Sequence, residues 1–227
     1  MSEADIQGIV LLSVQVAFVA VALALFPAIL VAKLLAHGRF RGRSLVSALV
    51  HLPLVLPPVV TGYILLIVFA RNQPVGAFLD GFGIRFAFSW IGAALAAALM
   101  AFPLILRPIR LAFEAQDEGL REIAATLGAS RWRRFYKVTL PLAWTGIVSG
   151  VVLGFAKALG EFGATITFVS NIPGETQTLS LAIYSLLQSP AGDRAALILI
   201  ALSITLSFLA MVISEWLAER VERKRGR

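Results

Sequence analysis

The sequence predicts an all-α integral membrane protein with five transmembrane helices, in one domain that covers residues 1–227. The first observation is composition: 59% of the residues are hydrophobic and 15% are charged, with a mean hydropathy of +0.86. A soluble domain has about 25% charged residues, so the apolar excess must face lipid. The second observation is a set of five long apolar runs. The third is that basic residues concentrate in alternate linkers between these runs.

Each apolar run is long enough to cross a bilayer, since a spanning helix needs about 20 apolar residues for roughly 30 Å of hydrocarbon. The expected spans are about 9–35, 45–70, 86–106, 138–159 and 195–217. The first span ends near Lys33, whose long side chain can reach the interface. The region 160–192 contains an apolar patch, a turn signal from Asn171 to Gly174 and a short amphipathic run. Each part is too short to cross, so we expect an extracytoplasmic loop with a re-entrant or interfacial helix.

The Lys and Arg residues predict the orientation, because cytoplasmic loops carry an excess of both. The linkers after the first and third runs and the C-terminal tail contain Arg39, Arg41 and Arg43; Arg107, Arg110, Arg121, Arg131, Arg133, Arg134 and Lys137; and Arg220, Arg223, Lys224, Arg225 and Arg227. The opposite side has only Arg71, Arg85 and Arg194, and the N-terminal segment is acidic. This pattern predicts an N-out, C-in topology. It also explains the net charge of +7 without nucleic-acid binding.

Several kinds of site are excluded by residues that the sequence lacks. There are no cysteines, and the only histidines are His37 and His51, so neither a disulfide nor an obvious metal centre is expected. The phosphate-binding pattern GxxxxGK[ST] is absent, so we expect this chain to bind neither ATP nor Mg²⁺ itself. The sequence contains no cluster of acidic residues with a histidine that would suggest an integral-membrane enzyme. We therefore expect no catalytic residue.

Local signals between the third and fourth runs predict two short cytoplasmic helices. Asp117 can cap a helix from about Glu118 to Leu127. Gly128 then occupies the position after the helix, where a positive φ costs glycine little. Ser130 can cap a second, basic helix. The first helix has an apolar face with i, i+3, i+4, i+7 spacing, made of Leu120, Ile123, Ala124 and Leu127. An apolar face outside the bilayer must be covered by something. In an ordinary amphipathic linker, the lipid headgroups would cover it.

The segment 122–141, EIAATLGASRWRRFYKVTLP, resembles the cytoplasmic EAA loop of ABC-importer permeases. That pattern is Glu-Ala-Ala, three residues, Gly, nine residues, Ile-x-Leu-Pro, and here Ile123 and Val138 replace an Ala and the Ile. The resemblance implies that this helix, in a coupling loop of about residues 114–137, docks in a groove on a separate ATP-hydrolysing subunit. The coupling residues would be Glu122, Ala124, Ala125, Gly128, Arg131, Leu140 and Pro141.

Prolines interrupt the second run at Pro53, Pro57 and Pro58. They remove backbone donors, and lipid cannot satisfy the freed carbonyls, so this broken helix should face protein or a water-filled path. A simple proline kink is the alternative. If the break is functional, Pro57, Pro58 and Gly62 belong to a pathway or gate.

The end of the fourth run contains two ionisable residues, Lys157 and Glu161, which are four residues apart and so share a helix face. They are either an interfacial anchor or, with Phe162 and Gly163, part of a gate. The same run contains a ridge of small residues that allows close helix approach, within the chain or between subunits: Gly146, Gly150, Gly154 and Ala158.

The stretches HLPLVLPPVVTGYILL and GEFGATITFVSNIPGETQTL are similar to the molybdate branch of these permeases. The resemblance implies a methionine-importer-like type I fold, a homodimer in the bacterial inner membrane, two ATP-binding subunits and an extracytoplasmic oxyanion-binding protein. Molybdate, with tungstate, would be the cargo, and ATP and Mg²⁺ would bind to the partner ATPase. A sulfate or thiosulfate permease is the nearest alternative, and an ATP-independent secondary transporter or channel is one of a different class. No arginine cluster lies within the apolar runs, so selectivity is expected to reside in the binding protein.

Overall fold

The computed structural model describes residues 3–38, 40–189 and 193–225, and all the regular structure within them is helical. In chain order the helices are α1 (Glu3–His37), α2 (Arg43–Val55), α3 (Pro58–Phe69), α4 (Pro74–Asp80), α5 (Trp90–Glu114), α6 (Glu118–Thr126), α7 (Arg131–Arg134), a π-helix (Phe135–Thr139), α8 (Leu140–Leu142), α9 (Trp144–Leu159), α10 (Gly163–Val169), α11 (Leu179–Leu187) and α12 (Asp193–Arg225).

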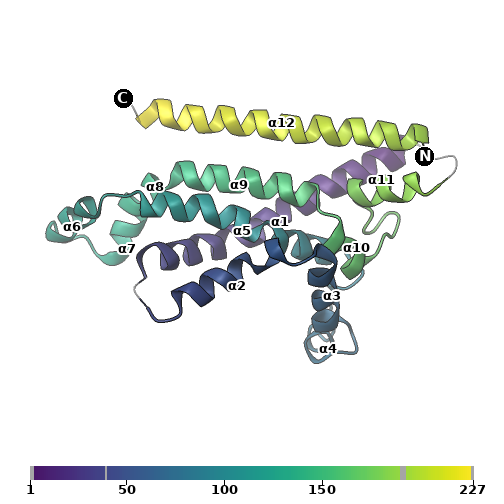
Figure 1. The fold of residues 1–227 in the computed structure, drawn as a ribbon, viewed down its shortest axis with the longest axis horizontal. Coiled ribbons are helices and arrows are strands. Elements are labelled where there is room, and N and C mark those ends of the chain that lie inside the picture. The colour runs from purple at the N-terminus through teal and green to yellow at the C-terminus, as the bar shows by residue number, and fades with distance from the viewer. Residues whose placement is uncertain (1–2, 39, 190–192, 226–227) are drawn as a thin grey trace.

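Helix α5 is the centre of the bundle, with α1 and α9 packed against it and α12 lying along α9 (Figure 1). Small side chains make this close packing possible, because they let helix backbones approach. A Cβ added at Gly150 would lie 2.6 Å from the Ile105 carbonyl oxygen, and one at Gly146 would lie 2.6 Å from that of Pro108. The glycine ridge of α9 therefore packs against α5 of the same chain.

The second apolar run forms two helices, α2 and α3, which meet at an angle of 109°. Pro57 and Pro58 lack backbone N–H groups, and a residue before proline avoids the helical region. Leu56 is accordingly extended, with φ −69° and ψ 142°. Figure 1 shows α3 and α4 projecting sideways from the bundle. The break predicted from the prolines is present. The angle of 109° shows that this run is two separate helices and not one kinked helix.

The fourth apolar run is also interrupted, to an extent that its residues do not predict. The segment Arg131–Leu142 meets α9 at an angle of 65°. Pro141 cannot donate a hydrogen bond, and the turn before it widens into the π-helix. The straight part of the run therefore starts at Trp144, six residues later than the expected start at 138.

Helix α5 is longer on its C-terminal side than the apolar run predicts. It starts at Trp90, where the Ser89 hydroxyl accepts a hydrogen bond from the Gly92 N–H at 3.2 Å. It continues to Glu114 rather than ending at residue 106, because polar residues can extend a helix beyond the apolar layer. The ion pair between Arg110 and Glu114, with an N–O distance of 2.8 Å, supports this last turn.

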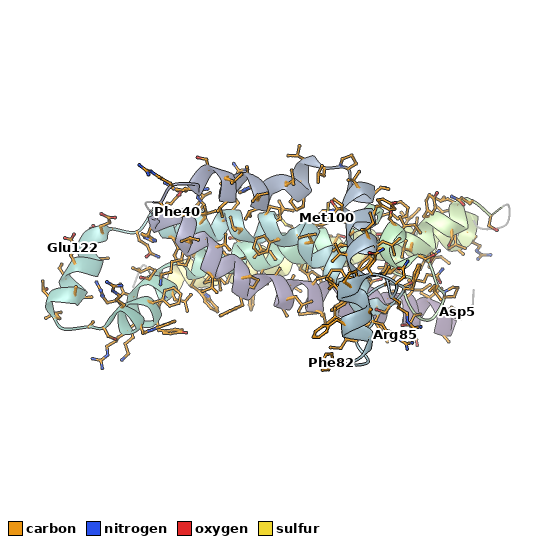
Figure 2. All side chains as sticks on the ribbon, turned by 90° about the horizontal axis from the view of Figure 1, so that it is seen from below. Asp5, Phe40, Phe82, Arg85, Met100 and Glu122 are labelled. Atoms are coloured by element: carbon orange, nitrogen blue, oxygen red, sulfur yellow. The ribbon has the colours of Figure 1, made fainter. Side chains whose placement is uncertain are left out.

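Among the described residues, three helices are long and apolar enough to span a membrane: α1, α5 and the segment Arg194–Ile213 of α12. Counting each bent pair as one span raises the number to five. Helix α1 begins at one end of the bundle, and α12 runs toward the other end, where α6 lies (Figure 1). Figure 2 shows Asp5 and Glu122 at these opposite ends.

The region 160–192 contains the two short helices α10 and α11, each less than ten residues long. Helix α10 packs against α3 and α5, whereas α11 packs against α12 and α1. The Leu179 N–H donates to the Ser13 hydroxyl at 2.7 Å, which ties the start of α11 to α1. Each helix is too short to cross the bilayer alone, and the extracytoplasmic position of this region stays a prediction.

The carboxylate of Asp80 holds together the segment that follows α3. Asp80, at the end of α4, pairs with Arg85 at 2.6 Å and with Arg71 at 2.8 Å. The hydrogen bond from Arg85, followed by that from Arg71, lowers the pKa of Asp80 below its ordinary value of 3.8. Because the pKa of Asp80 is lowered, both ion pairs are intact above the ordinary value of 3.8. They are lost only as the pH falls through the lowered pKa.

Candidate functional site: the α6 loop and the α3–α10 junction

The local geometry of α6 follows the predicted caps. The Asp117 carboxylate accepts a hydrogen bond from the Gly119 N–H at 2.8 Å, and the helix runs from Glu118 to Thr126. Gly128 has φ +76°, a conformation that glycine adopts without strain. Its N–H donates to the Ala125 carbonyl at 3.0 Å, which satisfies one of the last carbonyls of the helix. The chain therefore makes a tight turn here before α7.

The apolar face of α6 has no cover within the described chain. The exposed fractions are 47% for Leu120, 58% for Ile123 and 81% for Leu127. On α7 and the π-helix, Trp132 is 70% exposed and stacks on Tyr136 with 5.9 Å between ring centroids. Large apolar side chains are thus exposed on both sides of the Gly128 turn.

Two contacts that the sequence did not predict hold the base of this loop. The Gln116 side chain donates to the Thr139 carbonyl at 2.8 Å, which joins the end of α5 to the π-helix. The Lys33 ammonium of α1 lies 3.8 Å from the centroid of the Phe135 ring, a cation–π contact. The sequence predicts only that the Lys33 side chain can reach the interface. Both contacts join segments that are distant in sequence, so no local pattern could reveal them.

The remaining predicted coupling residues fall in two groups. Glu122 and Ala125 are exposed on α6, and Arg131 is exposed as the first residue of α7. Ala124 is half-buried. Leu140 is also half-buried and packs against the main core, whereas Pro141 lies at the surface beside it. Glu122, Ala125 and Arg131 are therefore available to a partner, whereas Leu140 joins the end of the loop to the core.

The predicted pathway residues meet where α3 packs on α10. A Cβ added at Gly163 would lie 2.7 Å from Pro58 Cβ, and one added at Gly62 would overlap the Ala164 carbonyl oxygen. Only glycine allows the two helices to approach this closely. Pro57 lies beside this contact as an exposed residue that precedes α3.

The Lys157–Glu161 pair connects the end of α9 to the start of α10. The Lys157 ammonium donates to one oxygen of the Glu161 carboxylate. The other oxygen accepts the Ala164 N–H at 3.0 Å, so the carboxylate also caps α10 near its positive N-terminal end. The side chain of Glu161 is only 1% exposed and that of Lys157 is 28% exposed. Phe162 follows, with its ring centroid 4.8 Å from that of Tyr184.

Residues 24–223 match the family model described as binding-protein-dependent transport system inner membrane component. The chain belongs to this family of ABC-transporter permeases.

Curated relatives of this permease match it along most of their length. The molybdenum transport system permease protein ModB of Escherichia coli (strain K12) is 54% identical over 218 residues, which are 96% of this chain and 95% of the relative. The protein of the same name from Haemophilus influenzae is 51% identical over 95% of this chain and 94% of its own. The sulfate transport system permease protein CysT of Escherichia coli (strain K12) is 37% identical over 85% of this chain and 71% of its own.

The permease also shares its fold with solved structures of low sequence identity. The inward-facing MetNI methionine ABC transporter gives a TM-score of 0.72 at 19% identity, over 97% of this chain and 99% of the solved one. A bacterial importer of the polysaccharide alginate gives a TM-score of 0.69 at 20% identity, over 98% of this chain and 80% of the solved one. The predicted methionine-importer-like fold is therefore confirmed.

Membership of the family places the chain in the inner membrane as a multi-pass subunit. It is the permease subunit and not the catalytic one, since in such transporters ATP binds to a partner ATPase. The family description itself refers to a binding protein. A channel or transporter that works without ATP is thus no longer an alternative.

Proposed function

We propose that this permease imports molybdate, and tungstate as a near-isosteric companion, in an ATP-driven transporter. The observation that carries the proposal is the 54% identity to a molybdenum transport permease along 96% of the chain. The sulfate permease is less similar, at 37% identity, and leaves sulfate as the competing cargo. The absence of an arginine cluster from the apolar runs supports a path that conducts the anion and leaves its selection to the binding protein.

In the proposed assembly, two copies of the chain enclose the path between them. Two ATPase subunits cover the cytoplasmic side, and an oxyanion-binding protein docks on the outside. Each ATPase subunit receives one α6 in a groove, where the exposed face of Leu120, Ile123 and Leu127 is buried. Burial of about 25 cal/mol per Å² of apolar surface would supply much of the docking free energy.

Movement of α6 would reach the membrane helices through the base of the loop. When ATP draws the two ATPase subunits together, each α6 moves with its groove. The Gln116–Thr139 hydrogen bond and the Lys33–Phe135 contact join the loop to α5, the π-helix and α1. Because these contacts tie the loop to the bundle, the loop and the bundle would move together as a rigid body. The path would then open to alternate sides of the membrane.

We further propose that the α3–α10 junction is part of the gate. The chain breaks at Pro57 and again at Gly160, so both α3 and α10 have a hinge at one end. The Lys157–Glu161 pair fixes the angle between α9 and α10. A change in that angle would move α10, and with it α3, across the path.

The direct test is ATP-driven uptake into proteoliposomes that contain the permease, its ATPase and its binding protein. We expect uptake of labelled molybdate and tungstate that requires ATP and the binding protein. Uptake of sulfate alone would retain the transporter class and reject the cargo. Uptake that continues without ATP would reject the coupled mechanism.

The role of the α6 loop is tested at Gly128 in the same assay. Valine at φ +76° is strained by about 1–3 kcal/mol, so Gly128→Val should distort the turn and abolish most of the ATP-driven uptake. The matched control is Gly128→Asn, since asparagine tolerates the left-handed region. We expect Gly128→Asn to retain most of the uptake, with both variants inserted normally in the membrane. Full uptake by Gly128→Val would contradict the coupling role.

A further inference from the structure

Basic side chains from α2 and α5 line an open cleft at the α6 end of the bundle. The cleft has a volume of about 730 Å³. Its polar lining includes Arg43, Ser44 and Ser47 from α2 and Arg107, Arg110 and Glu114 from α5. Three arginines and one glutamate give these side chains a net formal charge of +2.

A single carboxylate organises two of the three guanidinium groups. Glu114 accepts from Arg110 at 2.8 Å and from Arg43 at 3.3 Å, which brings residues 71 positions apart into contact. Arg110 also reaches the Ser47 hydroxyl at 3.4 Å. Arg107 lies one helical turn before Arg110, and no ion pair to it is found within the described part of the chain. Its charge is therefore available to a ligand.

The start of α2 adds further hydrogen-bond donors to the same cleft. Helix α2 begins after Gly42, which has φ +99°, and no side chain caps it. The Arg43 N–H donates to the Phe40 carbonyl at 3.4 Å, and the N–H groups of the first turn place the positive end of the helix dipole beside Arg43 and Ser44. The Ser44 and Ser47 hydroxyls can donate as well. Among the described residues, Glu114 is the one acidic group that lines the cleft, and its carboxylate is already engaged by two arginines.

We infer that this cleft binds a tetrahedral oxyanion of charge −2 at the cytoplasmic mouth of the permease. Guanidinium groups match the oxygens of such an anion in a forked geometry, and a +2 cleft compensates its charge. The inference rests on the proposed function for its natural ligand, the imported anion as it leaves the path. A cationic mouth would attract an anion out of an apolar channel, and salt would weaken the attraction. The phosphate of an anionic lipid headgroup has the same chemistry and is the second source to be tested.

The test is equilibrium binding of labelled molybdate, without binding protein, to the permease–ATPase complex in nanodiscs of phosphatidylcholine. We expect saturable binding that Arg107→Gln weakens by about tenfold, the loss expected for one charge-assisted hydrogen bond. Arg41→Gln is the matched control, because it removes the same charge from an exposed residue in the linker before α2 that does not line the cleft. Glu114→Gln should bind the anion more tightly, since it frees Arg43 and Arg110.

Equal losses in Arg107→Gln and Arg41→Gln would overturn the inference, because they would indicate a diffuse surface charge. Nanodiscs with anionic lipid distinguish the two sources. If molybdate does not bind in phosphatidylcholine while an anionic lipid is retained by the wild type and lost from Arg107→Gln, the cleft binds headgroups and its role in release is rejected. The ATP-driven uptake of the wild type separately tests the proposed function. Uptake without Arg107-dependent binding would reject the cleft alone, and binding without uptake would reject the proposed function alone.

Discussion

Glu161 uses both of its carboxylate oxygens, one for an ion pair and one for a helix cap. Because its side chain is almost fully buried, each of these partners is hard to replace with water. Lys157 keeps partial contact with the surroundings. Glu161 therefore links the end of α9 to the start of α10 through both of its carboxylate oxygens.

Glu161→Gln should fold but transport poorly. The amide oxygen can still accept the Ala164 N–H, whereas Lys157 loses its counter-ion, and breaking a buried pair costs about 3 kcal/mol. We expect a lower Tm in detergent and a reduced rate of uptake. Adding Lys157→Met should restore much of the Tm, since it removes the unpaired charge. If uptake stays low in the double variant while the Tm recovers, the charged Lys157–Glu161 pair itself belongs to the gate. A single variant with full uptake and an unchanged Tm would contradict the role given to the pair.

At the scale of elements, the contact between α3 and α10 depends on two glycines that are about one hundred residues apart. Gly62 faces the backbone of Ala164, and Gly163 faces Pro58. A backbone carbonyl cannot rotate away as a side chain can, so added volume at Gly62 must separate the helices. This contact is the most extensive one between α3 and the rest of the bundle, whereas α2 packs on α5.

Gly62→Ala should therefore destabilise the permease by about 1–3 kcal/mol, the usual cost of overpacking, despite the better helix propensity of alanine. Gly160→Ala is the control in the same region. Its Cβ would meet nothing closer than 3.8 Å, and its φ of −91° suits alanine. Thermal unfolding in detergent should show a lower Tm for Gly62→Ala only. Equal Tm values for both variants would mean that α3 is not held by this contact.

For the whole molecule, α6 lies at one end of the bundle and the start of α1 at the other (Figure 1). The cationic cleft is lined by the start of α2 and by the end of α5 that leads into α6. The apolar side chains of α12 are largely exposed along the bundle, as expected for a helix that faces lipid. This polarity agrees with the N-out, C-in topology predicted from the basic linkers, in which the loop at Arg41 is cytoplasmic and the loop at Glu175 is extracytoplasmic.

Single cysteines in this cysteine-free chain can test that topology. Arg41→Cys should react with a membrane-impermeant thiol reagent only after the membrane is opened, and Glu175→Cys should react in intact spheroplasts. Both residues are exposed. Ser170 is a poor site for such a probe, because its φ of +62° would strain a cysteine. The reverse labelling pattern would contradict both the topology and the docking of α6 on a cytoplasmic ATPase.

The sequence predicts best the features that depend on neighbouring residues. The caps at Asp117 and Gly128 are contacts within one turn, and the Lys157–Glu161 pair joins positions four apart. Hydropathy likewise predicts apolar helices, because lipid requires every backbone group to be bonded within its own segment. Their ends are less predictable: α5 runs eight residues past its apolar run, where the Arg110–Glu114 pair supports a polar turn.

By itself, then, the sequence determined the membrane class, the order of the helices, the family resemblance and the local shape of the α6 loop. Only the tertiary structure decided that α3 leaves α2 at 109° and packs on α10, and that the glycine ridge faces α5. It also decided that Arg43 and Arg110, which indicate only orientation in the sequence, share Glu114 in one cleft. The physical reason is that these contacts join segments far apart in the chain, and their geometry depends on how the whole bundle fills space.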